Sequence, residues 1–404
     1  MSSITEQFDS VLTGAPGDLG PFYRRAREDS PVFWSATASG WVISRYSDIK
    51  RVLSESDSFG SFFGGTGSTS IYGRTVLHME GLEHRRKDAL IAKHIRNRKS
   101  LSDSQENYIR QLCQRLVDEL PINETTDIKD GFTTPMPLQV TAWLMDMEEA
   151  VDFRTTYHRM VAASSSNQIG NPEILQDGLN AIQELHALIT PRLKVRRSVP
   201  GEDYLSTLCR SEYEGEPISD DEILSSSMFL LAAGVETTDR ALANLLRILI
   251  SQPELWDQLK SNRDLLLSTL AEGLRFSPPV HAINRVTKTD VSIGDQEVPE
   301  GSKVLLLLGA ANRDPEVFAE PDRFALDRFL QNAEAQFSAN ATVLSFSHNR
   351  HFCTGSLLAR LEMVEGMNLL LDTYRQIEWA GPVPEEEGYI LRSPKSLLVN
   401  LKTS

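Results

Sequence analysis

Apolar residues recur along most of the chain at the spacing of one face of an α-helix. Residues 104–120 and 173–193 are long examples, with apolar side chains at i, i+3, i+4 and i+7. No sequence repeat and no Pro/Gly/Ser-rich linker interrupts this pattern. Strand-like alternation is confined to the short stretches 40–46, 290–308 and 396–401. The pattern therefore predicts a mainly α protein, a single large helical domain over residues 1–404 with small β-sheets.

Charge and cysteine content exclude several classes of protein. The formal net charge of −15 argues against a general nucleic-acid binder, because binding phosphates needs a positive surface. Cys113, Cys209 and Cys353 form no CxxC pair, which argues against a disulfide framework and a structural zinc site. The N-terminus lacks a signal-peptide pattern, and no apolar run approaches the ~20 residues of a membrane span. We therefore expect a cytoplasmic protein that binds neither nucleic acid nor membrane.

The sequence FSHNRHFCTG, residues 346–355, places one cysteine in a short loop before a strongly helical stretch. A thiol near a helix N-terminus has a lowered pKa, because the free N–H groups there favour the thiolate. Arg350 and His351 add cationic or hydrogen-bonding groups beside Cys353, and Gly355 lets the backbone turn closely around the sulfur. Such a thiolate suits a nucleophile or a metal ligand, and an inert buried cysteine is the alternative.

This loop and three further motifs, in order along the chain, resemble those of the cytochrome P450 family. AAGVETT, which ends at Thr238, resembles the oxygen-binding groove, EGLR at 272–275 matches the ExxR motif, and AANRDPEVFAEPDRF at 310–324 resembles the meander. In the cysteine loop the family's usual glycine is Asn349. Asn tolerates a left-handed backbone, so we expect the turn to survive. The resemblance covers nearly the whole chain and implies the cytochrome P450 fold.

The resemblance also implies a haem b cofactor whose iron is held by Cys353. A thiolate ligand donates electron density to the iron and favours O–O cleavage. Phe346 would pack against the loop and help to exclude water. A second departure lies four residues after His84, where relatives commonly carry an arginine and this chain has Asp88. The side chains expected to hold the haem propionates are His84, Arg285 and His351.

The family's long central helix corresponds to the stretch around AAGVETT. Gly234 weakens the helix locally, so we expect the backbone beside Ala233 and Gly234 to open into a groove for dioxygen. Thr237 would act as a hydroxyl relay for protons and Glu236 as an acid connected to solvent. A buried threonine bonded to its own helix, beside a structural carboxylate, is the alternative.

The ExxR residues Glu272 and Arg275 lie three positions apart and therefore share one helix face. A buried ion pair must find further partners that compensate for the lost solvation. With Arg323 from the meander, the two residues are expected to form a structural network that supports the cysteine loop.

The substrate pocket is expected, by the same resemblance, to be framed by residues 59–79, the central helix, residues 280–283 and the turn 393–396. Its lining is mostly aromatic and aliphatic, which favours an apolar, ring-containing substrate. The individual residues expected to contact the substrate are Phe62, Phe63, Tyr72, Phe229, Ala232, Val280, Ile283 and Pro394.

The activity that the resemblance implies is a monooxygenase reaction, in which one atom of O2 enters a small molecule. We expect the product to belong to secondary-metabolite biosynthesis and the enzyme to be a monomer. No flavin or nicotinamide fingerprint occurs, so electrons are expected from a ferredoxin and its reductase. Residues 84–99 carry seven Lys and Arg against one Asp and are the expected docking segment for an acidic ferredoxin.

Several alternatives share these motifs. Oxidative cyclisation, C–C or C–N coupling, and desaturation proceed without net oxygen insertion. Peroxide-driven oxidation and a haem-binding sensor without turnover are further alternatives. A cysteine hydrolase is the alternative if the protein binds no haem.

Overall fold

The computed structural model describes residues 3–62, 71–95, 103–122, 124–147, 153–166, 171–213 and 215–403. The chain divides into two compact units. Unit 1 comprises Met1–Phe62, Arg110–Thr133 and Thr237–Ser404, and unit 2 comprises Phe63–Ile109 and Thr134–Glu236. Two of the boundaries fall inside helices, within α6 (Asp103–Glu119) and within α11 (Asp220–Ser251).

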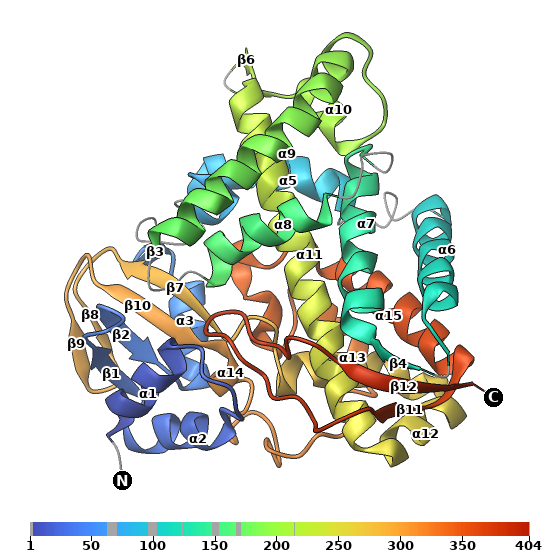
Figure 1. The fold of residues 1–404 in the computed structure, drawn as a ribbon. Coiled ribbons are helices and arrows are strands. Elements are labelled where there is room, and N and C mark those ends of the chain that lie inside the picture. Colours follow the sequence, from blue (N-terminus) through green and yellow to red (C-terminus); the bar gives the residue numbers. More distant parts are fainter. Residues whose placement is uncertain are drawn as a thin grey trace. The chain divides into compact units, whose positions relative to one another are not determined.

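Unit 1 holds a five-stranded sheet in the order β1-β2-β10-β7-β3 (Figure 1). β10 runs parallel to β2 and antiparallel to β7, with Val304 opposite both Trp41 and Arg285. A three-stranded sheet has the order β11-β12-β4, and β8 and β9 form a two-stranded sheet. The strands of unit 1 are β1 (Val32–Ser35), β2 (Gly40–Ile43), β3 (Phe59–Ser61), β4 (Thr125–Asp127), β7 (Ala282–Thr287), β8 (Val291–Ile293), β9 (Gln296–Val298), β10 (Lys303–Leu307), β11 (Tyr374–Trp379) and β12 (Leu398–Thr403). The three stretches predicted to be strands each contain one or more of them.

The helices of unit 1 pack against these sheets and against one another. Phe8 of the first helix and Phe22 of the second are buried with Phe33 of β1, with ring centroids 6.1 Å and 5.6 Å from that of Phe8. Besides parts of α6 and α11, the helices are α1 (Ile4–Leu12), α2 (Gly20–Asp29), α3 (Tyr46–Ser54), α12 (Pro253–Ser261), α13 (Leu266–Phe276), α14 (Leu308–Ala311) and α15 (Ser356–Thr373). The short helical turns are η2 (Lys129–Thr133), η4 (Arg263–Leu265), η5 (Ala333–Phe337), η6 (Leu344–Phe346) and η7 (Asn349–His351).

Two distant segments of unit 1 are joined by Arg392, whose side chain is fully buried. Its guanidinium donates to the backbone carbonyl oxygens of Ala15 at 3.2 Å, Gly17 at 3.0 Å and Glu386 at 2.7 Å. A buried guanidinium is tolerated here because carbonyl acceptors replace the water that it loses.

Unit 2 is mainly helical. Its longest complete helix, α9 (Pro172–Ser198), begins where the Asn171 side chain accepts the N–H of Glu173 at 2.9 Å, and it continues past Pro191. The helix predicted at 173–193 is therefore confirmed. The other elements are η1 (Val76–His78), α5 (Gly81–Ile95), α7 (Pro135–Leu144), α8 (Arg154–Val161), η3 (Ala162–Ser166), α10 (Tyr204–Cys209), β5 (Glu212–Tyr213) and β6 (Glu216–Pro217). In the part of the chain that the structure describes, no helix is long and apolar enough to cross a membrane.

Candidate active site

The cysteine loop lies in unit 1 and is closed by backbone hydrogen bonds. The N–H of Cys353 donates to the carbonyl oxygen of Phe346 at 2.8 Å, and the N–H of Phe352 donates to Asn349 at 3.0 Å. Asn349 has φ of 57°, so the left-handed conformation predicted for it is confirmed. Ser347 also has a positive φ, of 64°. The loop therefore makes two tight turns before it reaches the cysteine.

The thiol of Cys353 lies where the sequence predicts, just before a long helix. α15 begins at Ser356, with Gly355 as its N-cap residue. Cys353 is exposed, whereas Cys113 is buried. Because free cysteines are usually buried, the exposed thiol argues against the inert-cysteine alternative.

Aromatic side chains pack together at the cysteine loop. The ring centroid of Phe346 lies 5.8 Å from that of Phe337 and 6.2 Å from that of Phe352. Phe346 therefore packs against the loop as expected. Beside it, burial and the charge of Lys50 lower the pKa of His348.

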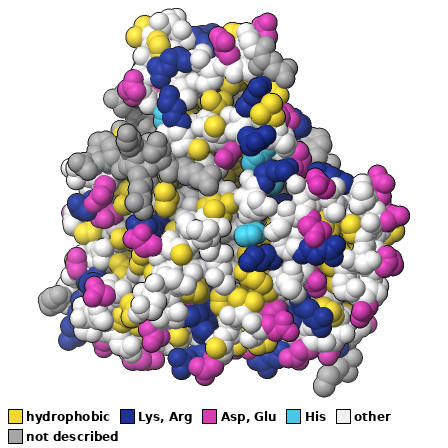
Figure 2. Space-filling view, turned by 180° about the vertical axis from the view of Figure 1, so that it is seen from behind, with side chains coloured by type: hydrophobic (Ala, Val, Ile, Leu, Met, Phe, Trp, Pro, Cys, Tyr) yellow, Lys and Arg dark blue, Asp and Glu magenta, His cyan; other side chains and the backbone are white. Residues whose placement is uncertain are grey.

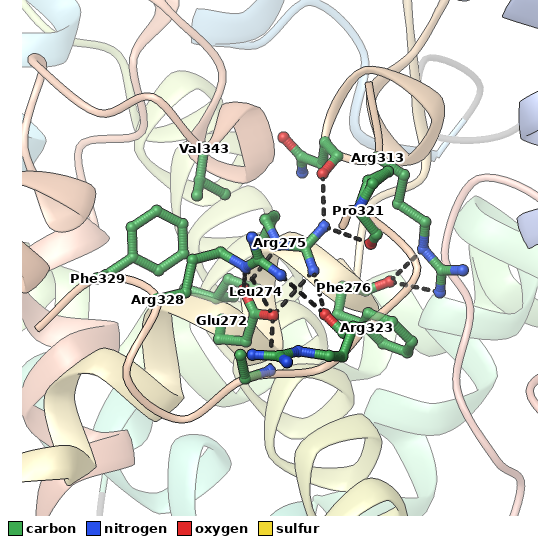
Figure 3. A network of polar contacts seen from close by, with 12 residues as sticks. Glu272, Leu274, Arg275, Phe276, Arg313, Pro321, Arg323, Arg328, Phe329 and Val343 are labelled. Atoms are coloured by element: carbon green, nitrogen blue, oxygen red, sulfur yellow. Dashed lines mark hydrogen bonds and ion pairs between the residues drawn. The ribbon is translucent and has the colours of Figure 1, made fainter. Parts of the chain in front are cut away.

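The ExxR pair forms a fully buried ion pair in α13 (Figure 3). Nε of Arg275 lies 2.7 Å from one Glu272 oxygen, and Nη2 lies 2.8 Å from the other. The remaining N–H groups of Arg275 donate to the backbone carbonyl oxygens of Asn312 at 2.9 Å and Pro321 at 2.8 Å. The network thus supplies the partners that such a buried pair requires.

The third charged residue of this network is Arg328, so the expectation for Arg323 is corrected. Nε of Arg328 lies 3.0 Å from the Glu272 carboxylate. Arg323 contributes its backbone carbonyl to Arg275, while its own side chain is 63% exposed and faces Glu320. The physical reason is that the chain turns between the two arginines, which leaves only Arg328 with its side chain directed at the buried carboxylate (Figure 3).

Asn312 connects this network to the segment that leads into the cysteine loop. Its Oδ1 accepts the N–H of Leu344 at 2.8 Å, and its Nδ2 donates to Oγ of Ser345 at 2.9 Å. Oγ of Ser345 in turn donates to the carbonyl of Leu274 at 2.6 Å. The ion pair therefore holds the backbone that immediately precedes Phe346.

Two of the three expected propionate ligands, Arg285 and His351, lie next to Ser61, a residue that the sequence motifs did not indicate. Ser61 of β3 lies opposite Arg285 of β7, and its Oγ lies 3.1 Å from Nε2 of His351. The third expected ligand, His84, is a buried residue of α5 in unit 2. The pairing of β3 with β7 and the hydrogen bond to His351 reveal Ser61, because a serine among aromatic residues and glycines carries no sequence signal of its own.

The expected opening of α11 at Gly234 is not seen. The helix is continuous from Asp220 to Ser251, with Glu236 buried and Thr237 half-buried. A Cβ atom at Gly234 would lie 3.0 Å from Oγ1 of Thr141 in α7. The glycine therefore allows two helices of unit 2 to pack closely. Ala233, next to it, is exposed.

The expected pocket residues fall in both units. In unit 2, Tyr72 donates its hydroxyl to Ser164 at 2.8 Å, and its ring lies edge-on to Phe229 at 6.5 Å. Burial raises the pKa of the Tyr72 hydroxyl, so it stays protonated. Half-buried Ala232 belongs to the same unit. Phe63 lies outside the described residues.

In unit 1, the expected pocket residues lie on or beside β7 and near the C-terminus. Val280 forms an isolated β-bridge with Leu391, and half-buried Ile283 belongs to β7. The ring of Phe62 lies under Nζ of Lys303 at 5.5 Å. Pro394 directly follows a short hairpin described below.

These residues fit a haem group. The exposed Cys353 lies just before a helix N-terminus, a position that would suit a thiolate ligand, and Arg285 and His351 carry the N–H groups that carboxylates bind. Among the described residues, no cluster of His, Cys, Asp and Glu offers three ligands for a bare metal ion. The fold and the site therefore define a mainly helical protein whose cysteine loop fits a prosthetic group.

Comparison with known proteins gives the family. A family model described as Cytochrome P450 matches residues 28–401. Pulcherriminic acid synthase of Bacillus subtilis (strain 168) is 29% identical over 384 residues, 94% of each chain. Cyclomarin C epoxidase CymV of Salinispora arenicola (strain CNS-205) is 25% identical over 388 residues, 94% of this chain and 95% of that protein. The crystal structure of CYP109E1 from Bacillus megaterium in complex with testosterone has a TM-score of 0.82 and 26% identity, covering 95% of this chain and 99% of that chain.

The chain therefore belongs to the cytochrome P450 family. It is a haem-binding monooxygenase with the fold of that family.

Proposed function

We propose that this protein oxidises a mostly apolar, ring-containing small molecule of secondary metabolism, with O2 and electrons from a ferredoxin and its reductase. The observation that carries the proposal is the exposed Cys353 at the start of α15, in a loop held by a buried ion network. Haem bound through this thiolate would supply the oxygen-activating chemistry.

The chain's own residues would bind the haem and move protons. Arg285, which lies opposite Ser61 in the sheet, and His351, which hydrogen-bonds to Ser61, would bind the propionates together with His84. Thr237 would pass a proton through its Oγ1, and the buried Glu236 carboxyl would supply it. Both residues lie on the same unbroken helix, which would hold the relay in a fixed geometry.

The substrate class is supported by the chemistry of the expected lining and by the relatives. Tyr72, Phe229 and Ile283 offer aromatic and aliphatic surface, which favours a ligand held by shape and a few hydrogen bonds. One relative is named an epoxidase of cyclomarin C and another a synthase of pulcherriminic acid. The CYP109E1 structure contains testosterone, a ring-containing and mostly apolar molecule.

Oxidative cyclisation or coupling without net oxygen insertion is the alternative outcome at the same site. The product mass distinguishes the two, since hydroxylation adds about 16 mass units and coupling removes about 2, by the atoms gained or lost. The name of the epoxidase relative favours oxygen insertion.

The electron donor would dock near the basic helix α5. Arg85 and Lys93 are exposed, whereas Lys87 is largely buried and pairs with Glu222. The basic residues after position 95 that the sequence suggested, Arg96 among them, lie outside the described residues. Figure 2 shows Lys and Arg side chains interspersed with Asp and Glu on one face of the protein, so basic surface is present despite the net charge.

The test of the assignment is spectroscopic. The reduced, carbon monoxide-bound protein should show the red-shifted Soret band of thiolate-ligated haem. Cys353→His should abolish that band, because imidazole is a neutral ligand. Cys113→Ala is the matched control and should keep the band. A thiolate band that survives in Cys353→Ala would overturn the ligand assignment.

A further inference from the structure

Three polar side chains form a stripe on the C-terminal part of α11. Arg240, Asn244 and Arg247 are spaced at i, i+4 and i+7, so they share one face of the helix. Thr237 precedes Arg240 by three positions and therefore lies at the head of the same stripe. All four residues belong to unit 1.

The three stripe residues bind a single segment, residues 386–393, which we call the C-terminal hairpin. Nη1 of Arg240 donates to Oγ of Ser393 at 3.1 Å. Nδ2 of Asn244 donates to the carbonyl of Arg392 at 3.1 Å. Nη2 of Arg247 donates to the Glu386 carboxylate at 2.6 Å. The hairpin therefore lies along about two turns of α11.

The hairpin is also fixed internally and on its other side. Its ends are closed by reciprocal backbone hydrogen bonds between Glu387 and Ser393, both of 3.2 Å. The N–H of Arg392 donates to Pro279 at 3.1 Å, and the N–H of His281 donates to Ile390 at 2.7 Å. The hairpin thus joins α11 to the residues just before β7.

Unlike the bonds from Asn244 and Arg247, the hydrogen bond from Arg240 is connected to Pro394, the residue that follows the hairpin. Oγ of Ser393 accepts from Arg240 and donates to the carbonyl of Pro394 at 3.2 Å. Arg240 therefore orients the first residue of the segment that follows the hairpin. Asn244 and Arg247 bind the hairpin farther along α11 from Thr237.

We infer that Arg240 is a positioning residue for the substrate, which sets the turn 393–396 against the Thr237 end of α11. The inference rests on the proposed function, in which Pro394 contacts the substrate. Arg247 and Asn244, by contrast, anchor the hairpin, and Asn244 also donates to the carbonyl of Ser277 at 3.2 Å. Arg240 acts through Ser393 and is not itself a catalytic residue.

The test compares two ligands that bind haem iron, 4-phenylimidazole and unsubstituted imidazole, by titrating the Soret shift. Arg240→Met should weaken 4-phenylimidazole binding about fivefold, the net scale of one typical hydrogen bond, and change imidazole binding by less than about twofold. In this inference the phenyl ring contacts the turn 393–396, whereas the smaller unsubstituted imidazole does not. Ser393→Ala should give the same selective loss, and the double variant no more than either single variant.

Arg247→Met is the matched control, because it removes the same side chain from the same stripe. It should lower the midpoint of thermal unfolding but leave the ratio of the two azole affinities unchanged. Arg240→Lys, which keeps a donor, should restore part of the affinity for 4-phenylimidazole. The inference is overturned if Arg240→Met changes both azole affinities equally or neither, or if Arg247→Met shifts their ratio as much.

Amide hydrogen exchange provides a readout that does not depend on haem. In Arg240→Met the amide of Ser393 should exchange about tenfold faster, as expected for a locally weakened hydrogen bond, whereas in Arg247→Met it should not. Equal exchange in the two variants would overturn the inference. A wild-type protein that shows no Soret shift with imidazole would instead count against the proposed function.

Discussion

At the scale of single residues, side chains of the same type that lie close in sequence bind different partners. Thr237 and Thr238 are adjacent in α11, yet the Thr238 hydroxyl binds the buried carboxyl of Glu362 in α15. Adjacent helical residues point about 100° apart, so the two hydroxyls serve different surroundings.

Thr237→Ala should leave haem binding intact and divert electrons to hydrogen peroxide. Product formed per NAD(P)H consumed should fall at least about tenfold, since positioned proton transfer contributes roughly 10²–10⁴-fold. Thr238→Ala is the neighbouring control and should keep the wild-type ratio. An unchanged ratio in Thr237→Ala would mean that protons arrive by another route.

The two arginines of the meander provide a second contrast. Arg328→Met leaves the buried Glu272 carboxylate with one charged partner fewer and should lower the free energy of unfolding by about 3–5 kcal/mol. Arg323→Met removes an exposed side chain and should change it by less than about 1 kcal/mol. Urea denaturation measures both variants, and equal effects would contradict the assignment of Arg328.

At the scale of elements, α15 carries a buried carboxyl that titrates near neutral pH. Burial raises the pKa of Glu362 from 4.5 to about 8, partly opposed by the hydrogen bond from Thr238. The folded protein therefore binds this proton more tightly than the unfolded chain does. The resulting stability is fully present below pH 4.5 and is lost as the pH rises through about 8.

Glu362→Gln should remove this pH dependence. Between about pH 5 and 8 the stability of the wild type should fall relative to the variant by about 1 kcal/mol per pH unit. Urea denaturation at several pH values measures the difference. Glu334→Gln, at an exposed carboxylate, is the control, and its free energy of unfolding should change with pH in the same way as that of the wild type. Parallel profiles for Glu362→Gln and wild type would show that Glu362 stays ionised in the folded protein.

At the scale of the whole molecule, electron delivery should depend on local charge and not on the net charge of −15. Arg85→Glu and Lys93→Glu should slow the first reduction by ferredoxin, because both side chains are exposed on α5. Raising the ionic strength should slow the wild type as well. Lys194→Glu, exposed on α9, is the charge-matched control. Stopped-flow reduction that is insensitive to both α5 changes would exclude this docking segment.

The sequence predicts the positions of helices and motifs better than it predicts which side chains contact one another in the folded protein. α6 and α9 follow from apolar periodicity, and the left-handed Asn349 follows from the residue type at the motif position that usually holds glycine. Arg328 could not be chosen over Arg323, because both lie in an irregular segment where only tertiary packing directs a side chain. The continuous helix at Gly234 was missed for a related reason, since the packing of Thr141 against it is a non-local contact.

The contact between Arg392 and the carbonyl oxygens of Ala15 and Gly17 constrains how the protein can be synthesised. Ribosomes deliver the chain from its N-terminus, so residues 15 and 17 emerge long before residue 392. Until Arg392 leaves the exit tunnel, the carbonyls of this early segment must be satisfied by water or by chaperones. The contact at residues 15 and 17 therefore forms late, and in nascent chains arrested before residue 392 this segment should remain sensitive to protease.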